Sequence, residues 1–433
     1  MKNSYSYYSK TFICILLGLL ISIQISGGDG SNSQSPNLTG LSVASFEVDA
    51  TPPLGYKMPY GTVVKTWDMG LRAKGIILLG AGRPIILLAV DWIGIGNEGQ
   101  DAFKQALASA AGTIPQRVAV HSLHQHDAPQ GDVQNDFVRE VLDRLVVAVH
   151  QSIDQAQPVT HIGMGTAQVY KVGSNRSIFG KDGKVRATRF TATPDSALRA
   201  EPEGLIDPMI SLISFWNVDK PLAVLSFYAT HPQSYYRLGV PNPDYPGLAR
   251  FMRQLAVPDA LHIHFTGAGG NVGAGKYNDG SHENRVILAE RLADGMKRAW
   301  ESSKLTPITA ASVDWMIVPV SIPCDTLKES NKESDFVKRY MAGNIIDIEC
   351  LTLGNARILF MPGELYVEYQ LAAKAMRPDL FVAMAAYGDT GAGYIPTADA
   401  FKRGGYEVET SKLLPEVENV LMTAMKKLLK GKP

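Results

Sequence analysis

The chain has 433 residues, of which 45% are hydrophobic and 19% are charged, a composition typical of a globular protein with a substantial core. Lysine plus arginine and aspartate plus glutamate both total 42, so the formal net charge is zero. This balance provides no basic excess that would favour nucleic acid or anionic lipid headgroups, and we expect no nucleic-acid partner.

The first 40 residues have the features of an export signal followed by a tether. Residues 11–23 (TFICILLGLLISI) form an apolar run behind two lysines, and the small residues SGGDG follow it at 26–30. The run is too short for a confident spanning helix, so the pattern predicts a secretory signal peptide over 1–28. The alternative is an uncleaved membrane anchor. The polar residues 29–40 predict a disordered linker, and we expect an exported protein, periplasmic or secreted.

From residue 41 onward, short apolar runs alternate with longer segments of helical periodicity. Several runs are apolar throughout, as expected of strands covered on both faces. Residues 135–156 and 283–303 carry apolar side chains at helical spacing. This alternation predicts an α/β layered domain with mixed β-sheets flanked by helices, extending over 41–433. The predicted strands are 83–93, 117–122, 208–216, 221–231, 260–267, 345–353, 356–364 and 380–388.

Polar side chains follow several of these predicted strands. Three of the nine histidines lie within six positions at the end of the strand 117–122. A single histidine is more often structural than functional, but neutral imidazole is also the commonest metal ligand in proteins. Ligand sites of open α/β sheets lie beyond the carboxyl ends of strands. The strand ends thus deliver imidazole, carboxylate and phenol groups, of which zinc accepts the first two readily. The residues are His121, His124, His126, His231, Glu364 and Tyr394.

Two further segments have less specific patterns. His262 and His264 share a face of the strand 260–267, as either the edge of a site or two buried structural histidines. The following GAGGNVGAG (267–275) lacks the GxxxxGK[ST] pattern of a phosphate loop, so it predicts a tight backbone turn that borders a pocket. Beyond the signal region, only Cys324 and Cys350 are present, which allows one disulfide at most.

Five motifs, which occur along the chain in the same order as in the family, resemble the neutral/alkaline (non-lysosomal) ceramidase family. HQHDAPQ (124–130) is similar to the family's His-Thr-His-Ser-Gly-Pro-Gly motif, and YATHPQS (228–234) to its Val-His-Gly-Thr-Ser segment. MPGE (361–364) is similar to Pro-Gly-Glu, NRS (175–177) to Asn-Arg-Ser, and GYIPTADAFKRGGYE (393–407) to Gly-Tyr-(Val/Ile)-Thr-Thr…Tyr-Glu. The resemblance spans most of residues 41–433. It implies the fold of the family's N-terminal catalytic domain, in a compact relative that lacks the C-terminal immunoglobulin-like domain.

The resemblance also implies a site, residue by residue. One group of residues would hold a zinc ion, and a second group would act on the substrate. In the second group one histidine would transfer protons, while an arginine and a tyrosine would donate hydrogen bonds to the developing oxyanion. The implied zinc ligands are His124, His231, Glu364 and Tyr394, and the implied catalytic residues are His126, Arg176 and Tyr406.

Three positions depart from the family pattern. Asn271 stands where the family has aspartate, Gly273 where it has a serine implicated in catalysis, and Asp127 where the first motif has serine. These departures affect the prediction of the substrate more than the prediction of the metal site. Outside the motifs, Asp91 at the end of the strand 83–93 is a candidate for orienting a ligand histidine. The alternative is a solvated aspartate at a strand end.

The N-terminal pattern and the resemblance together imply an exported zinc-dependent amidohydrolase of the neutral ceramidase superfamily. It would hydrolyse the N-acyl bond of ceramide or a ceramide-like lipid with zinc-activated water. The alternatives are a zinc hydrolase of the same fold acting on an acylated sugar, peptide or ester, and a non-catalytic binding protein. The expected cofactor is Zn²⁺, and the expected partner is a small or lipid-like N-acyl substrate, with peripheral membrane contact left open.

Overall fold

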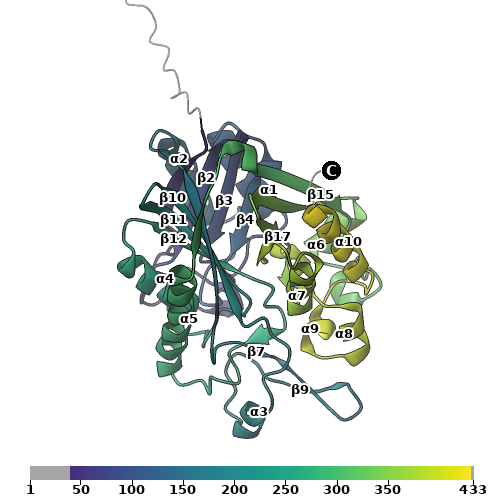
Figure 1. Cartoon of the computed structure of the whole chain (residues 1–433). Coiled ribbons are helices and arrows are strands. Elements are labelled where there is room, and N and C mark those ends of the chain that lie inside the picture. The colour runs from purple at the N-terminus through teal and green to yellow at the C-terminus, as the bar shows by residue number, and fades with distance from the viewer. Residues whose placement is uncertain (1–39, 431–433) are drawn as a thin grey trace, which may run out of the picture. The chain divides into compact units, whose positions relative to one another are not determined.

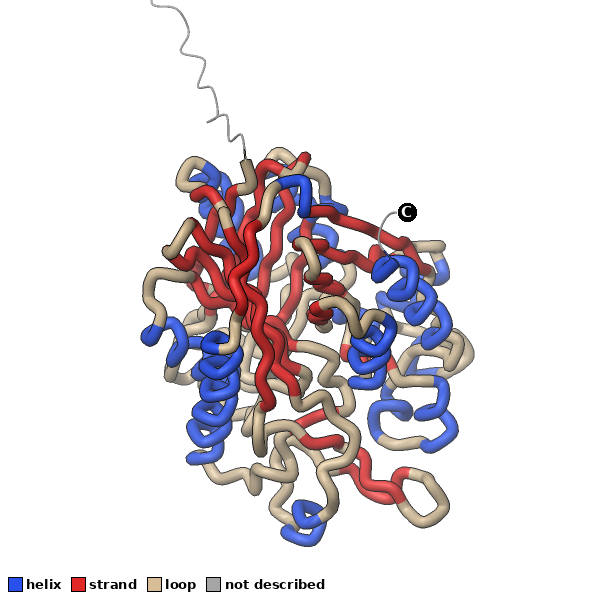
Figure 2. Tube along the Cα trace, viewed as in Figure 1, coloured by secondary structure: helices blue, strands red, loops and turns tan. Residues whose placement is uncertain are grey.

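The computed structural model describes residues 40–430, so the predicted signal peptide and nearly all of the predicted linker lie outside the described residues. The described chain forms three main mixed sheets with helices packed against them (Figures 1 and 2). The predicted α/β class, with mixed sheets flanked by helices, is confirmed. All eight predicted strands and both predicted helices are present, with ends shifted by a few residues.

The first sheet has the strand order β4-β3-β2-β1-β5. Its members pair antiparallel except for β3 and β4, which are parallel. Helices α1 and α2 pack on its outer face. The bounds are Ser42–Asp49 (β1), Arg72–Gly80 (β2), Gly82–Val90 (β3), Val118–Ser122 (β4), Gln157–Pro158 (β5), Glu98–Ala110 (α1) and Asp136–Ile153 (α2).

The second sheet has the order β12-β11-β10-β6-β14. Strands β11 and β12 form its parallel pair, and helices α4 and α5 pack on its outer face, as Figure 1 shows. The bounds are His161–Gln168 (β6), Met209–Asn217 (β10), Lys220–Tyr228 (β11), Leu261–Thr266 (β12), Lys304–Pro307 (β14), Asp244–Ala256 (α4) and Glu283–Glu301 (α5).

The third sheet has the order β15-β16-β17-β19, with β17 and β19 parallel. Helices α6, α7 and α10 pack on its outer face. The bounds are Val313–Val320 (β15), Ile346–Leu353 (β16), Ala356–Phe360 (β17), Phe381–Ala385 (β19), Asp335–Met341 (α6), Val367–Met376 (α7) and Val417–Lys430 (α10).

Short elements complete the described chain near the ends of these strands. Three two-stranded ladders join β7 to β13, β8 to β9 and β18 to β20. The bounds are Ser174–Asn175 (β7), Ser177–Phe179 (β8), Val185–Thr188 (β9), Val272–Gly273 (β13), Glu364–Leu365 (β18), Tyr394–Ile395 (β20), Ser196–Ala200 (α3), Ala398–Arg403 (α8) and Tyr406–Thr410 (α9).

The inner faces of the three sheets share one apolar core. In β3, Ile85 and Leu87 point into this shared core, whereas Ile86 and Leu88 point outward against α1 and α2. A strand that is buried on both faces needs apolar side chains at every position, which explains why its sequence has no alternation. The loops that follow the parallel pairs supply the residues of the candidate site.

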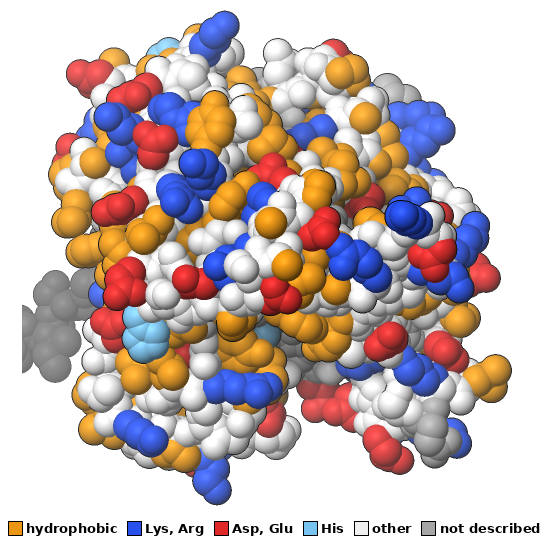
Figure 3. All heavy atoms as spheres, turned by 90° about the horizontal axis from the view of Figure 1, so that it is seen from below, with side chains coloured by type: hydrophobic (Ala, Val, Ile, Leu, Met, Phe, Trp, Pro, Cys, Tyr) orange, Lys and Arg blue, Asp and Glu red, His pale blue; other side chains and the backbone are white. Residues whose placement is uncertain are grey.

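Three other sequence-based expectations concern cysteines, membrane spans and surface charge. Cys324 and Cys350 are buried free thiols, so the one disulfide that the sequence allowed does not form. Among the described residues, no helix is long and apolar enough to cross a membrane. On the face shown in Figure 3, acidic and basic side chains are interspersed, in keeping with the zero net charge.

Candidate metal centre

Three side chains from distant parts of the chain meet beyond the ends of the strands. His124 follows β4, His231 follows β11, and Glu364 begins β18. Glu364 Oε2 lies 3.2 Å from His124 Nε2 and 3.1 Å from His231 Nε2. All three side chains are largely buried. The structure thus brings together three of the four residues that the sequence predicted as zinc ligands.

Backbone carbonyl groups orient both imidazole rings. His124 Nδ1 donates to Ile93 O at 2.7 Å, and His231 Nδ1 donates to Gly269 O at 2.7 Å. Because a carbonyl oxygen can only accept, Nδ1 carries the hydrogen in each ring, and in the neutral ring Nε2 presents a lone pair. Metal-binding histidines are usually held by such a hydrogen bond from the second ring nitrogen.

This donor set fits a cation. In the neutral tautomers, two Nε2 lone pairs face a carboxylate oxygen with no hydrogen between them. Burial is the largest influence on His231 and lowers its pKa to about 4, although the adjacent Glu364 carboxylate favours the protonated ring. Burial alone would raise the pKa of Glu364, but His124 and His231 hold it well below its usual range. An ionised carboxylate and two imidazole lone pairs form a donor set that zinc accepts.

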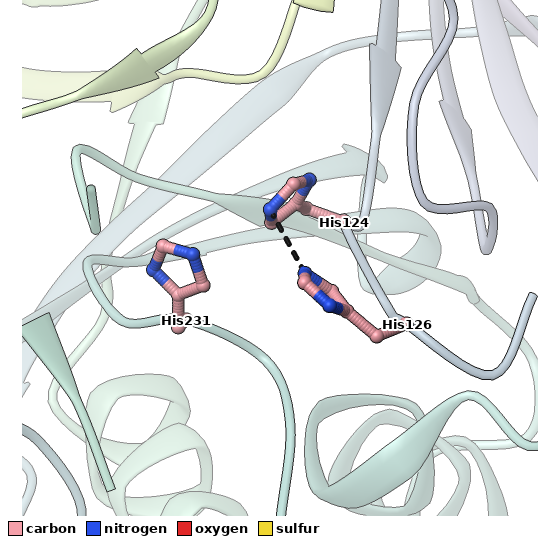
Figure 4. Close-up of side chains that lie close together, drawn as sticks. All are labelled: His124, His126 and His231. Carbon is pink, nitrogen blue, oxygen red and sulfur yellow. Dashed lines mark hydrogen bonds between the residues drawn. The ribbon is translucent and has the colours of Figure 1, made fainter. Parts of the chain in front are cut away.

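His126 lies beside the same point but is held differently. Its Nε2 is 3.2 Å from His124 Nε2, and the nearest nitrogens of His124, His126 and His231 all lie within 4.8 Å of one another (Figure 4). Its Nδ1 lies 3.2 Å from the hydroxyl of the half-exposed Tyr60. Burial, followed by the two neighbouring imidazoles, lowers the pKa of His126 well below its usual value. The position suits either a further metal donor or a proton carrier.

Tyr394 and Arg176 lie next to these donors. Arg176 Nη1 donates to Tyr394 Oη at 3.1 Å, and Tyr394 Oη lies 3.5 Å from His231 Nε2. Arg176 is buried, and its Nε lies 3.1 Å from a carboxylate oxygen of Glu407, which is fully buried. Burial raises the pKa of the Tyr394 phenol, and Arg176 opposes this without overcoming it. The phenol is therefore protonated unless a further positive charge lies beside it.

Tyr406 lies further out, at the edge of the site. Its side chain is 38% exposed, and its ring centroid is 5.8 Å from that of Tyr394. The Arg176 guanidinium carbon lies 5.4 Å from the Tyr406 ring centroid, and the exposed Phe190 packs against the same ring at 5.2 Å. Tyr406 thus contacts the predicted catalytic arginine through its ring, among residues that are accessible from solvent.

The glycine-rich segment 267–275 passes between the loops that carry the donors. A Cβ atom on Gly270 would lie 2.3 Å from Glu364 O, and a Cβ on Gly269 would lie 2.6 Å from Thr230 C. Side chains at these positions would therefore push the donor loops apart. The absence of a side chain lets the backbone approach that closely, as the predicted tight turn requires.

Gly273, one of the departures from the family pattern, lies against the site. It pairs with Ser174 in the β7–β13 ladder. An added Cβ would lie 3.7 Å from Arg176 Cγ and 4.0 Å from His231 Cβ, which are ordinary contact distances. The position therefore faces two candidate site residues and has room for a small side chain.

Asn271, the other departure in this segment, has a structural explanation. Its Oδ1 accepts a hydrogen bond from Val367 N at 2.9 Å, and its Nδ2 donates to Glu368 Oε2 at 2.9 Å. An aspartate at this position would set a second carboxylate against Glu368. The amide is thus matched to its neighbour at the start of α7.

Asp127 supports a loop beside His126. Its Oδ1 accepts backbone hydrogen bonds from Arg237 at 2.8 Å and Leu238 at 3.3 Å. The Arg237 guanidinium lies 4.9 Å from the Tyr60 ring centroid, so this loop packs against the tyrosine that bonds His126. A serine at position 127 would have a neutral hydroxyl in place of this charged acceptor.

The candidate role of Asp91 in orienting a ligand histidine is wrong. Both carboxylate oxygens of Asp91 accept hydrogen bonds from Arg250 at 2.7 Å, and one also accepts from Arg72 N at 2.9 Å. Asp91 and Arg250 are almost fully buried. The carboxylate forms a buried ion pair with α4, and backbone carbonyls orient the histidines instead.

The other histidines singled out in the sequence lie away from the donors. His262 and His264 are buried on β12, and His264 Nδ1 lies 2.9 Å from the Ser226 hydroxyl. The structural interpretation therefore holds for this pair, although a hydroxyl is the partner of His264. His121 is buried, and its Nδ1 donates to Ala386 O at 2.7 Å.

Tyr60, Tyr387 and Glu407 were not anticipated as residues of the site. The Tyr387 ring stacks on His124 with centroids 4.5 Å apart, and its hydroxyl lies 3.5 Å from His231 Nδ1. His124 and Tyr387 both have positive φ angles, of 69° and 61°, a strained conformation that is concentrated at functional sites. Glu407, the partner of Arg176, directly follows Tyr406 in the motif. The one sequence feature that could have identified Tyr387 as a site residue is its position just after the end of β19.

Comparisons with known proteins give a likeness in fold. No protein-family model and no curated protein sequence matches the chain. Among solved structures, it is similar to one described as a ceramidase complexed with C2 and to neutral ceramidase from Pseudomonas aeruginosa. Each is 14% identical with a TM-score of 0.66, over 90% of this chain and 75% and 74% of the respective structures. This likeness confirms the fold that the sequence resemblance implied.

Proposed function

We propose that this protein is a zinc-dependent hydrolase that cleaves the amide bond of an N-acyl substrate, such as ceramide or a ceramide-like lipid. The observation that carries the proposal is the convergence of His124, His231 and Glu364, with both imidazoles oriented by backbone carbonyls. The fold shared with ceramidase structures supports it. A protein that only binds its ligand would not need this donor set beside a third imidazole and a buried arginine.

His124, His231, Glu364 and Tyr394 would hold the zinc ion, with His126 close enough to be a competing donor. Zinc, when bound, lowers the pKa of water to ~7 and polarises a carbonyl group. Arg176 supports ionisation of Tyr394, because its guanidinium donates to the phenol oxygen at 3.1 Å.

His126 would carry the proton that amide cleavage requires. Its lowered pKa keeps the ring neutral at neutral pH. One ring nitrogen then has a lone pair, so the ring can accept a proton from water and deliver one to the leaving nitrogen. Such a positioned acid–base group contributes ~10²–10⁴-fold to a rate. The Tyr60 hydroxyl at Nδ1 would keep the ring in place.

Arg176 and Tyr406 would act on the substrate carbonyl. Glu407 fixes the Arg176 guanidinium beside Tyr394. The positive charge of the guanidinium would stabilise the negative charge that develops on the carbonyl oxygen. Removing a donor of this kind typically costs ~3 kcal/mol of transition-state stabilisation. Tyr406 lies at the exposed edge of the site, from which its hydroxyl would donate a second hydrogen bond to the same oxygen.

Gly273 supports a second candidate of the same chemistry. The space that a side chain would occupy beside Arg176 and His231 is open, so a substrate with a bulkier or more polar head group than ceramide would fit. An acylated sugar, peptide or ester is such a substrate. We also propose that residues 1–28 are a signal peptide that directs export. A single hydrolase domain would follow from residue 41 onward.

The test is release of free amine from a panel of N-acyl substrates by purified, zinc-supplemented protein. The panel contains short-chain N-acyl sphingosines, N-acyl amino sugars and N-acyl amino acids, each with and without a chelator. Glu364→Gln removes one negative donor with little change in shape, and Glu301→Gln removes an exposed carboxylate far from the site as the matched control.

We expect chelator-sensitive turnover of at least one class, lost in Glu364→Gln and kept in Glu301→Gln. Cleavage that persists in Glu364→Gln at the wild-type rate would refute the proposed site. The absence of any turnover by protein that does contain zinc would refute the proposed reaction.

A further inference from the structure

A cavity of about 830 Å³ lies apart from the candidate metal centre and shares none of its donor residues. Its wall is built from α1, the end of β4, strands β15 to β17 and residues 388–389. This volume lies within the range of small-molecule sites. The cavity is notable for the polar side chains that line it.

Two buried side chains in this wall have an acceptor atom that is not used by the described residues. Gln100 is 8% exposed; its Nε2 donates to Val120 O at 3.1 Å, and its Oε1 is buried without a hydrogen-bond partner. His121 is 3% exposed; because its Nδ1 donates to a carbonyl, Nε2 is an acceptor in the neutral ring. Burial lowers the pKa of His121 to about 4, which keeps the ring neutral.

A third buried acceptor, Glu349, has one cationic partner among the described residues. Lys104 Nζ lies 2.6 Å from Glu349 Oε1, and the Glu349 side chain is 5% exposed. Burial raises the pKa of Glu349 to about 7, although Lys104 opposes the shift. A second positive charge beside this carboxylate would therefore be favourable.

The charged residues of the lining have an acidic excess. Lys104 and Arg339 are the two cations, and they pair with Glu349 and Asp101. Asp347 and Asp389 also line the cavity, so four carboxylates face two cations and the formal excess is two negative charges. Ile317, Ile346 and Phe360 provide apolar wall beside them.

We infer that this cavity binds a small organic cation, namely an ammonium group attached to a short aliphatic or aromatic body. The ammonium would donate hydrogen bonds to Gln100, His121 and Glu349, and the apolar body would lie against the isoleucine and phenylalanine side chains. An ammonium carries donors and no acceptor, which matches the unused acceptors of the wall.

Such a ligand would lie behind the loops of the metal centre. Gly388 lines the cavity and directly follows Tyr387, whose ring stacks on His124. Met361 also lines it, three residues before Glu364, and Met361 O accepts a hydrogen bond from Gly388 N at 3.1 Å. The inference goes beyond the proposed function and does not depend on it, because no donor residue lines the cavity.

The test is calorimetric titration of the full chain at pH 7.5 with hexylammonium, and with hexanol and hexanoate as neutral and anionic analogues of equal length. Each titration is run on zinc-loaded and on chelator-treated protein, because an amine can also bind zinc. We expect one hexylammonium per chain with equal affinity in both forms, and binding of hexanol and hexanoate at least tenfold weaker.

Glu349→Gln should weaken hexylammonium binding at least tenfold, and Glu301→Gln, at an exposed pair on α5, should not change it. Glu349→Gln leaves Lys104 buried without its partner, so two further variants test the cavity independently. The double variant Lys104→Gln, Glu349→Gln removes both charges, and Ile317→Trp fills the cavity and changes neither charge. Both of these variants should also lose hexylammonium binding. Equal binding of hexanol, preference for hexanoate, dependence on zinc, or unchanged binding in the folded variants would each overturn the inference.

Discussion

Substitution of Gly273 by serine probes how the candidate site selects its substrate. A serine Cβ would meet Arg176 Cγ at 3.7 Å, Arg176 Cδ at 3.8 Å and His231 Cβ at 4.0 Å, all within ordinary contact range. The glycine does not have the positive φ that side chains avoid. Replacing glycine at such a position restricts the unfolded chain and typically adds ~0.4–1 kcal/mol of stability. The variant should therefore fold and keep its metal.

The functional effect follows from the new hydroxyl between Arg176 and His231. One additional neutral hydrogen bond to a bound substrate contributes ~0.5–1.5 kcal/mol, which corresponds to about a 2- to 13-fold change in kcat/KM. We expect the ratio of kcat/KM for a short-chain N-acyl sphingosine to that for an N-acyl amino sugar to rise by this factor. If the native substrate is the acylated sugar, peptide or ester of the second candidate function, the wild-type chain should be poor or inactive toward the sphingosine substrate.

The assay measures kcat/KM for both substrates in the wild type, in Gly273→Ser and in the control variant Gly40→Ser. Gly40 is exposed, and a Cβ there would meet nothing within 4 Å. The control should match the wild type for both substrates. Efficient cleavage of the N-acyl sphingosine by the wild type, with an unchanged ratio in Gly273→Ser, would refute the reasoning that this position sets specificity.

Four further predictions concern proton transfer, packing and charge. His126→Ala should retain zinc but lose ~10²-fold or more in kcat; loss of zinc would make His126 a ligand instead. Gly270→Ala should lower zinc affinity and the melting temperature, because its Cβ would lie 2.3 Å from Glu364 O, and unchanged affinity would contradict the packing described. Asp91→Asn should lower the free energy of unfolding by ~3–5 kcal/mol, since it leaves Arg250 buried without its counter-ion. Zinc affinity should be unchanged. A loss of zinc without a loss of stability would show that Asp91 does orient a metal ligand. Stability should fall as the pH drops from about 6.5 to about 4, because unfolding lets buried histidines such as His121, with a native pKa of about 4, bind protons that the folded state excludes; a flat profile of unfolding free energy in this window would contradict it.

The strands and the approximate place of the site could be predicted from the sequence. Strands such as β3 are buried on both faces, so their apolar runs are unbroken and easy to find. Their ends also mark where His124, His231 and Glu364 leave the sheets. Position along the chain was therefore enough to select residues that meet within 3.2 Å.

Contacts between side chains far apart in the sequence could not be predicted. Asp91 pairs with Arg250 on α4 because the two elements pack together, and nothing local to Asp91 marks this. The hydrogen bonds that distinguish His124 from His126 are made by a carbonyl of Ile93 and by the Tyr60 hydroxyl. The 830 Å³ cavity likewise combines residues from 100 to 389, so it exists only in the folded chain.

Metal content is the most direct test of the central claim. Purified wild-type protein and His231→Ala are dialysed against the same buffered zinc, and bound metal is measured by inductively coupled plasma mass spectrometry. His262→Ala, which removes a buried histidine on β12 away from the donors, is the matched control. We predict close to one zinc per chain in the wild type and in the control, and much less in His231→Ala. Full occupancy in His231→Ala, or no zinc in the folded wild type, would contradict the account.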